Sequence, residues 1–368
     1  MSNKDSEKKF AIEEFFENSD VQVFDLLHVV YPDHPVYKNT EMIQRYWRWW
    51  FREIPGKKGR VFGVPGDNCI AGVRPLSCFS FMVNGHEEVG GFLNATVTHP
   101  DYRKRGFFSK SLHYVLDVAG KEEKLRFAIS FPNDNSYPLH LKNPRIAALC
   151  DLPLYVKVLR PEKISGKIPL PVPVLKVLLS MAQRAKKRTL PRGVSIQEIK
   201  NFDSRFDKFW EKVKSLNKVW IERTSAYLNW RYAQSPLGQY SIFAAVDQRD
   251  GAIRGYIVTK DEMRFGLNLG LILDLVVLPE ENSCATLLAG RGIERLQQQG
   301  VDVIGCLMLK HHPLVRALRE NGMRHVSGRF APRKFHVTIS QLIDDQQFNA
   351  FILNPENWFL MWGDTDTV

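Results

Sequence analysis

One short basic turn combines the residue types and the setting that bind a phosphorylated ligand. The turn spans residues 103–108 and reads Arg-Lys-Arg-Gly-Phe-Phe. An apolar strand-like run at 92–98 precedes it, apolar residues at helical spacing follow over 108–119, and a second strand-like run covers 127–131. The first turn of a helix leaves backbone N–H groups without partners, and the helix dipole favours an anion there. The pattern therefore predicts an anion site, and a pyrophosphate group is the ligand that we expect.

The residues of this turn resemble the phosphate loop of the GNAT superfamily, the acyl-CoA-dependent N-acyltransferases. That loop reads Gln/Arg-x-x-Gly-x-Gly/Ala, and Arg103 and Gly106 fit it after the lead-in at 99–102. Position 108 is Phe where the family has Gly or Ala, and a subset of the family carries a bulky residue followed by Ser, as in Phe108-Ser109. An exposed basic turn without a ligand is the alternative interpretation.

The resemblance implies acetyl-CoA or a related acyl-CoA as co-substrate. Its diphosphate would lie on the loop, and its pantetheine would lie between two splayed strands. The basic side chains of the loop would add charge-assisted hydrogen bonds to the phosphates. The residues implied to contact acyl-CoA are Thr96, Val97, Thr98, Arg103, Lys104, Arg105, Gly106, Phe107, Phe108, Ser109, Asn133 and Ser136.

A histidine stands where the family usually has its general acid. The family often shows Asn-x-x-Ala-x-x-x-Tyr after the second splayed strand; here Asn133 and Ser136 match, and His140 takes the Tyr position. Imidazole has a pKa near neutrality, so His140 is the first candidate to protonate the departing thiolate. Tyr137 precedes it on another face and is the second candidate. A histidine that only packs its helix is an equally weighted alternative for His140.

The general base has no clear position in this sequence. Relatives frequently carry an acidic residue on the strand before the phosphate loop, where Ala95 stands. Glu88, on a predicted hairpin, is the acidic candidate that we name, with solvation as the alternative. Asp364 and Asp366 in the tail are candidates to bind a cationic amine substrate, and solvation is again the alternative.

The chain repeats one order of elements. The blocks at 46–51 and 227–232 both read Tyr-x-x-Trp-x-aromatic and are followed by Pro, and an apolar strand that ends in Pro recurs at 97–100 and 276–279. A repeat at one long period indicates a duplicated domain. The second copy is acidic where the first has the basic loop, so we expect a degenerate copy. Asp274 of this copy takes the place equivalent to Ala95; burial among apolar neighbours would favour its protonated form, and a structural carboxylate is the favoured alternative.

The fold class is therefore expected to be α/β, with mixed sheets in two GNAT-like domains in tandem, joined by a helical linker. Helices are expected at 10–16 and 40–51, and Asn84-Gly85 predicts a tight hairpin. The expected divisions are an acyl-CoA-binding domain at 1–160, a proline-containing helical linker at 161–193, a degenerate domain at 194–340 and a docking C-terminal tail at 341–368.

Composition limits the compartment and the partners. Of the 368 residues, 44% are hydrophobic and 25% charged, as in globular proteins. The 5 cysteines form no CxxC pair, which predicts no metal site and suits a reducing cytoplasm. No run of about 18 apolar residues and no secretory signal is present.

The net charge of +11 comes without a nucleic-acid-binding motif, so nucleic acid is not an expected partner. Contact of 170–190 with a membrane surface is an option, and a packed connecting helix is the favoured one.

Together these features predict a cytoplasmic N-acyltransferase that transfers an acyl group directly from acyl-CoA to a small-molecule amine, and acetyl is the acyl group that we expect. An amino sugar is one candidate acceptor. No Cys-His or Ser-His spacing suggests a covalent enzyme intermediate. Two alternatives stay open: a non-catalytic acyl-CoA-binding module, and an aminoacyl transferase of the peptidoglycan-bridging type. The basic loop counts against the second of these.

Overall fold

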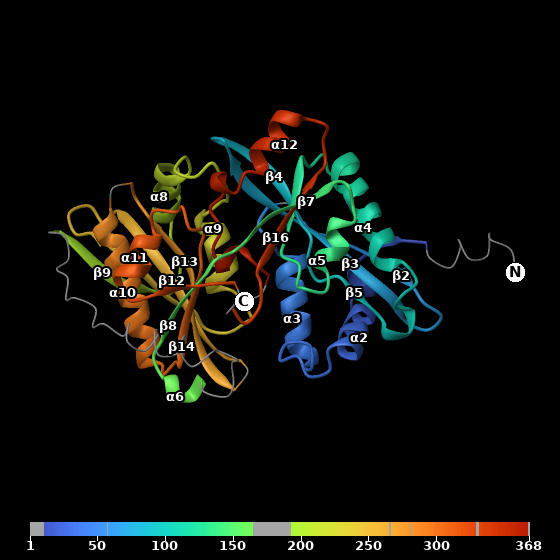
Figure 1. Ribbon diagram of the computed structural model, residues 1–368, viewed down its shortest axis with the longest axis horizontal. Helices are drawn as coiled ribbons and strands as arrows, with labels where there is room; N and C mark the ends of the chain where they lie inside the picture. Colours follow the sequence, from blue (N-terminus) through green and yellow to red (C-terminus); the bar gives the residue numbers. More distant parts are fainter. Residues whose placement is uncertain are drawn as a thin grey trace, which may run out of the picture.

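The computed structural model describes residues 11–56, 58–164, 193–264, 266–279, 281–328 and 331–366, and within them two β-sheets lie beside each other (Figure 1). The first sheet contains β1 (Glu13–Phe15), β2 (Arg60–Pro65), β3 (Ile70–Val83), β4 (His86–Phe92), β5 (Val97–Thr98), β6 (Phe127–Ser130), β7 (Ile146–Asp151), β10 (Val219–Ile221) and β16 (His336–Gln341). The second contains β8 (Leu154–Val158), β9 (Val194–Ile199), β11 (Ser241–Asp247), β12 (Ile253–Arg264), β13 (Leu267–Val277), β14 (Val303–Leu307) and β15 (Arg324–Val326).

The strand order is mixed in both sheets. The first runs β1-β2-β3-β4-β6-β16-β7, with β5 and β10 paired to β3, and the second runs β15-β8-β14-β13-β12-β11-β9. Each sheet has one parallel pair, β4 with β6 and β13 with β14, among antiparallel neighbours. The predicted fold class, α/β with mixed sheets in two halves, is confirmed.

Helices cover the sheets and connect their strands. They are α2 (Asp20–Val30), α3 (Thr40–Phe51), α4 (Phe107–Asp117), α5 (Tyr137–Leu141), α6 (Pro161–Ile164), α8 (Arg205–Val213), α9 (Ser225–Leu228), α10 (Asn282–Gln298), α11 (Val315–Glu320) and α12 (Gln346–Ile352). None of the described helices has both the length and the apolar character needed to cross a membrane. The segment 170–190 lies outside the described residues.

Two local predictions can be compared with the elements directly. The tight hairpin is confirmed: Val83 pairs with His86, and Asn84 and Gly85 have φ of 50° and 83°, the left-handed backbone that such a two-residue turn needs. The predicted helix at 10–16 is wrong for its described residues, because β1 pairs with β2 there.

The reason for that strand is a close contact made possible by a glycine. A Cβ on Gly63 of β2 would lie 2.3 Å from the ring of Phe15. The ring of Phe15 is buried over Gly63, where a side chain would otherwise lie. This burial and the pairing with β2 stabilise a strand, whereas a short isolated helix has little stability of its own. The other predicted helix is confirmed as α3, which Asn39 caps through its side chain on the N–H of Met42.

The two sheets exchange strands across the expected division of the chain. Strand β8 follows β7 in sequence and pairs with β14 of the second sheet, while β16, near the other end of the chain, pairs with β6 and β7 of the first. Figure 1 shows both crossing strands between the two halves. The limits 1–160, 161–193, 194–340 and 341–368 stay a prediction, and the sheets interleave across them.

The repeated Tyr-Trp blocks meet at the centre of the molecule. The rings of Trp49 and Trp230 stack with centroids 5.0 Å apart. Each indole donates to the other residue's backbone carbonyl, with N···O distances of 2.6 Å and 2.9 Å. These two tryptophans occupy the same place in the two repeats, so the duplication seen in the sequence becomes a reciprocal contact between the halves. Tyr46 and Tyr227 are buried beside them, as core residues.

Candidate functional site

The basic turn leads directly into α4, as the sequence predicts. Gly106 is the N-cap residue with φ of 82° and offers no side chain to the helix, and Lys104 also has a left-handed backbone. The first hydrogen bond of the helix runs from the N–H of Lys110 to the carbonyl of Gly106, at 3.1 Å. The N–H groups of residues 107–109, in the first turn of α4, therefore have no helical partner, whereas the N–H of Arg103 donates to the Pro100 carbonyl at 3.2 Å. Residues 103–106 are exposed, so a ligand can reach these donors and the positive end of the helix dipole.

The strand before this turn carries a β-bulge where it separates from its parallel neighbour. The last pair between β4 and β6 is Phe92 with Ile129. Phe92 pairs with Ser77 of β3, and Val97 pairs with Val73. Between these two pairs, the four residues 93–96 lie opposite the three residues 74–76. An extra residue in one strand defines a bulge, and bulges often lie beside active sites. Ala95, inside it, has φ of 47°.

The bulge leaves strand backbone without partners. Among the described residues, Asn94, Ala95 and Thr96 make no hydrogen bond through their backbone groups. The Asn94 side chain is buried as well, and neither of its amide atoms has a partner. Buried polar groups nearly always form hydrogen bonds, so the polar groups of this short segment are available to hydrogen-bond a ligand. Of the predicted contact residues here, Val97 and Thr98 pair with β3.

The segment after β6 forms a capped turn. The Asn133 Oδ1 accepts from the N–H groups of Asn135 and Ser136, at 3.0 Å and 2.9 Å, and this turn starts α5. Asn133 is exposed. The predicted contact residues Asn133 and Ser136 therefore hydrogen-bond each other just after β6, near the place where β4 and β6 separate, which we call the strand opening. Their direct contact with a ligand stays a prediction.

His140 lies inside the molecule beside the phosphate-loop helix. Its ring centroid is 5.4 Å from that of Phe108, and its Nδ1 is buried without a partner. Burial, with a smaller effect of the Arg74 charge, lowers the pKa of His140 to about 3. The imidazole is therefore neutral at physiological pH. The predicted acid role rested on a pKa near neutrality and loses that basis; the neutral ring can still donate or accept one hydrogen bond.

Tyr137 is held by a second histidine. Its ring stacks on His336 with centroids 3.8 Å apart and an interplanar angle of 7°. His336 in turn bridges Asp151 at 2.6 Å and Asp134 at 3.0 Å. Burial and then the Asp151 charge raise the pKa of the Tyr137 hydroxyl. The catalytic role of Tyr137 stays a prediction.

Glu88 is on the wrong part of its strand for catalysis at the bulge. Its carboxylate pairs with Arg126 at 2.9 Å. Glu88 precedes Asn94 by six positions, which corresponds to about 20 Å along a strand. The structure therefore corrects the expectation that Glu88 is the base: it does not bring Glu88 to the strand opening, and the carboxylate already has a cation.

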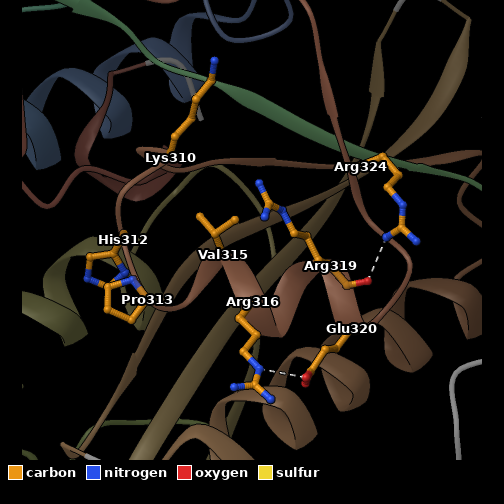
Figure 2. Close-up of a pocket in the computed structure, with 8 residues that line it drawn as sticks. All are labelled: Lys310, His312, Pro313, Val315, Arg316, Arg319, Glu320 and Arg324. Atoms are coloured by element: carbon orange, nitrogen blue, oxygen red, sulfur yellow. Dashed lines mark hydrogen bonds and ion pairs between the residues drawn. The ribbon is translucent and has the colours of Figure 1, made fainter.

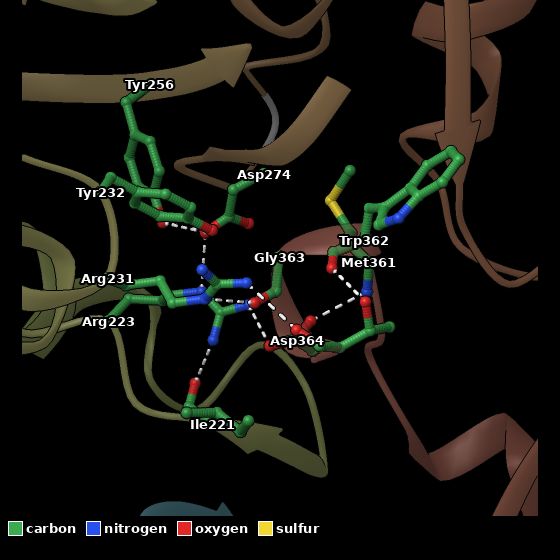
Figure 3. Close-up of polar contacts among 11 residues, drawn as sticks. Ile221, Arg223, Arg231, Tyr232, Tyr256, Asp274, Met361, Trp362, Gly363 and Asp364 are labelled. Atoms are coloured by element: carbon green, nitrogen blue, oxygen red, sulfur yellow. Dashed lines mark hydrogen bonds and ion pairs between the residues drawn. The ribbon is translucent and has the colours of Figure 1, made fainter. Parts of the chain in front are cut away.

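Asp364 belongs to a buried ionic network in the second half, shown in Figure 3. It pairs with Arg223 at 2.6 Å, and Arg223 also pairs with Asp274 at 2.8 Å. The Tyr256 hydroxyl donates to Asp274, at 2.9 Å. Both carboxylates are buried. Asp274 is thus a structural carboxylate as expected, while the predicted substrate contact at Asp364 is corrected to a structural ion pair.

Asp366 differs from its neighbour in the tail. Its Oδ1 is buried without a partner. Burial raises the pKa of Asp366 to about 6, against smaller opposing effects of a backbone hydrogen bond and of the Arg333 and Arg231 charges. A carboxylate with an unused oxygen remains able to bind a cation, so the predicted substrate role of Asp366 stays open.

Sequence reasoning missed Arg74, which lies under the first turn of α4. Its Nε donates to the Ser111 Oγ at 3.0 Å and its Nη2 to the Phe108 carbonyl at 3.1 Å. The guanidinium is fully buried. The available signal was a single charged residue inside the apolar strand β3, since buried charges are rare unless they are paired or functional.

A separate cavity lies in the second half of the molecule. It has a volume of about 610 Å³, lies beside α11 and is lined mainly by basic residues, whose arrangement Figure 2 shows. Arg316 pairs with Glu320, and Arg324 donates to the Arg319 carbonyl. These side chains are held by local partners, and no buried unsatisfied group lies among those drawn. The strand opening beside α4 remains the better supported site.

Solved structures share this fold, whereas no family model and no curated protein matches the sequence. A probable N-acyltransferase from Enterococcus faecalis aligns over 90% of this chain and 73% of its own, with 13% identity and a TM-score of 0.60. N-myristoyltransferase from Saccharomyces cerevisiae, solved with myristoyl-CoA and inhibitors, aligns over 90% and 80%, with 12% identity and a TM-score of 0.58.

A third similar structure has the same two-part organisation. A tandem GNAT protein from the clavulanic acid biosynthesis pathway aligns over 92% of this chain and 100% of its own, with 12% identity and a TM-score of 0.56. Together with the two mixed sheets, this likeness shows that the chain has a tandem GNAT fold, as the resemblance of the basic loop predicts. Identities this low establish the fold, and the activity is argued from the site.

Proposed function

We propose that this protein is an acyl-CoA-dependent N-acyltransferase that binds acyl-CoA in its first half. One observation carries the proposal. Within a single strand, loop and helix unit, the backbone of residues 94–96 has no hydrogen bond and the N-terminus of α4 has no side-chain cap. Unbonded strand backbone suits the amide groups of pantetheine, and an uncapped helix start suits a diphosphate. The strand backbone at 94–96 and the start of α4 follow each other along the chain, as the pantetheine and the diphosphate do along coenzyme A.

The chemistry proposed is direct transfer to an amine. The amine nitrogen forms a bond to the thioester carbonyl carbon and loses a proton, the carbon–sulfur bond breaks, and coenzyme A leaves as a thiolate that takes up a proton. In this scheme the backbone N–H groups at the bulge stabilise the negative charge that develops on the carbonyl oxygen. Asp366 is the proposed contact for a cationic acceptor. His140, being neutral, acts in this scheme only as a hydrogen-bonding group.

The acyl chain and the acceptor are the two unknowns of this proposal. Acetyl-CoA is the proposed co-substrate, in line with the resemblance of the loop. The similar yeast enzyme was solved with myristoyl-CoA, so the class of ligand is supported and chain length is a quantity to measure. A small-molecule amine in the cytoplasm, with an amino sugar as one candidate, remains the proposed acceptor.

The binding half of the proposal is tested with two glycine variants that differ only in position. Gly106 and Gly85 both have left-handed backbone, and a Cβ on either would meet nothing within 4 Å. Gly106→Glu places a carboxylate at the proposed phosphate site, whereas Gly85→Glu places the same charge on a distant hairpin. Calorimetric titration with coenzyme A should show affinity at least about tenfold weaker for Gly106→Glu and unchanged for Gly85→Glu. Equal affinities in the two variants would contradict the assigned site.

The catalytic half is tested by release of free thiol from acyl-CoA esters of increasing length in the presence of an amine panel. Turnover supports the enzyme. Binding without turnover on any amine supports the non-catalytic module, which the neutral His140 and the apolar Ala95 favour. An aminoacyl transferase that needs no diphosphate loop would instead keep its activity in Gly106→Glu.

A further inference from the structure

Three arginine side chains are almost completely buried among the residues that the structure describes, and they differ in how their charge is balanced. Arg223 pairs with two carboxylates, those of Asp274 and Asp364. Arg231 donates to the carbonyls of the tail residues Gly363 and Thr365, at 3.0 Å each. Figure 3 shows both arginines with the tail residues Gly363 and Asp364. Arg74, in the other half, is the third, and among the described residues no carboxylate pairs with it.

The partners of Arg74 are neutral and leave part of the guanidinium unused. The Nε and Nη2 donate to a hydroxyl and a carbonyl of α4, and the group lies 4.5 Å from the centre of the Phe108 ring. Its Nη1 is buried without any partner. Burial lowers the pKa of Arg74 to about 9, so the side chain stays positively charged at neutral pH. The protein thus holds a buried cation that none of its described residues neutralises.

The position of this cation is fixed by the packing of β3 against α4. A Cβ on Gly72 would lie 2.5 Å from the Phe107 ring, so position 72 faces the start of α4. Side chains two apart on a strand share a face, and Arg74 accordingly reaches the first turn, at Phe108 and Ser111. His140, also with a buried nitrogen that has no partner among the described residues, lies with its ring centroid 5.4 Å from that of Phe108.

Such an arrangement is unfavourable for the protein alone. A buried charge without a counter-charge carries a large desolvation cost. The nearby N-terminus of α4 is the positive end of the helix dipole, so it repels the guanidinium. A negative ligand at the helix start would interact favourably with both. The exposed basic turn shows where that ligand enters, and Arg74 lies behind it.

We propose that Arg74 supplies the buried positive charge of the anion site at α4, and so determines affinity for the diphosphate of the bound nucleotide. This rests on the proposed function for the identity of the nucleotide, acyl-CoA. Arg74 is a positioning residue in this role: it holds the first turn of α4 by its two hydrogen bonds and adds its charge to the potential at the helix start.

The test separates charge from packing with Arg74→Met and Arg74→Lys in the full chain. The probes are coenzyme A, inorganic pyrophosphate and pantetheine, which lacks phosphate. Arg74→Met should bind coenzyme A and pyrophosphate at least about tenfold more weakly and bind pantetheine as the wild type does. It should unfold at the same or a higher temperature in the absence of ligand, because replacing an unbalanced buried charge by an apolar side chain often stabilises a protein. Arg74→Lys keeps the charge and should keep most of the affinity.

One control variant completes the design. Arg223→Met should lower the unfolding temperature markedly, since it leaves two buried carboxylates unpaired. That contrast shows that the assay detects a structural arginine when there is one.

The outcomes are distinct. A lower unfolding temperature in Arg74→Met together with equal losses for pantetheine and coenzyme A would make Arg74 a structural residue and overturn the proposal, as would unchanged affinity for pyrophosphate or equal losses in the Lys and Met variants. Wild-type protein that binds pyrophosphate through Arg74 but not coenzyme A would leave this inference standing and remove the acyltransferase. Wild-type protein that binds neither would overturn both.

Discussion

Burial decides what each titratable side chain around the loop can contribute. Arg74 and His140 both contact the ring of Phe108, and both have a lowered pKa because they are buried. For the arginine, the group stays charged and can attract an anion. For the histidine, the group becomes neutral and cannot act as a strong acid. Burial therefore leaves Arg74 charged but makes His140 neutral, because the ordinary pKa of arginine is much higher than that of histidine.

The neutral state of His140 predicts a dependence of stability on pH. In the unfolded chain the imidazole binds a proton below its ordinary pKa of about 6.5, whereas in the folded protein the pKa is lowered to about 3. The unfolded state thus binds more protons between these values. Stability is retained above pH 6.5 and falls as the pH drops towards 3, by about 1.4 kcal/mol per pH unit from this residue.

The measurement is urea unfolding at several pH values between 7 and about 4. His140→Gln, which cannot titrate, should lose stability less steeply than the wild type over this range. His86→Gln is the control, because His86 is exposed on the β3–β4 hairpin and meets water in both states. Identical slopes in the wild type and in His140→Gln would contradict the buried neutral state.

At the scale of elements, the site depends on how closely α4 approaches β3. Gly72 makes this approach possible: its hydrogen lies where any side chain would overlap the Phe107 ring, at 2.5–2.7 Å from its atoms. Phe107 is buried and is the first residue of the helix. The contact therefore fixes the height of the helix start above the sheet, and with it the position of the free N–H groups.

Gly72→Ala should disturb both the packing and the site. Overpacking in a core costs about 1–3 kcal/mol, and a displaced first turn should also weaken binding of coenzyme A at temperatures where the protein is folded. Thermal unfolding and calorimetric titration check the two effects. Gly328→Ala, where the new Cβ meets nothing within 4 Å, is the matched control. Unchanged stability and affinity in Gly72→Ala would show that the helix start is not set by this contact.

At the scale of the whole molecule, the two halves are joined by more than a linker. Strands β8 and β16 each lie in the sheet of the other half. The reciprocal bonds of Trp49 and Trp230 cross the same interface, and the tail packs Trp358 and Trp362 into the core. One continuous cluster of buried apolar side chains spans both sheets.

This continuity predicts a single cooperative unfolding transition. Neither sheet keeps its strand order when the other half unfolds, so the halves should lose structure together. Far-ultraviolet circular dichroism and tryptophan fluorescence should give the same midpoint in urea, with and without coenzyme A. Two separated transitions would indicate halves that fold independently in spite of the exchanged strands.

Local features of the site could be predicted from the sequence because they depend on neighbouring residues. The glycine at 106 with a basic turn before an apolar helix, the Asn84-Gly85 hairpin and the repeated Tyr-Trp blocks are written in adjacent residue types. They were sufficient to predict the loop, the start of α4, the duplication and the fold class. Asp274 was also expected to be structural, since apolar residues surround it in sequence.

The rest was decided by contacts between distant segments. Glu88 lies away from the strand opening because of its place along β4, and Asp364 is buried because Arg223, far away in sequence, lies opposite it. The sequence shows a charged residue in an apolar strand at Arg74, but only the structure shows that no carboxylate of the described residues pairs with this charge. Residue types determine which charges the chain carries, but the energy of a charge depends on its burial and its neighbours. Only the tertiary structure sets those two quantities, and with them the residues able to hold a ligand.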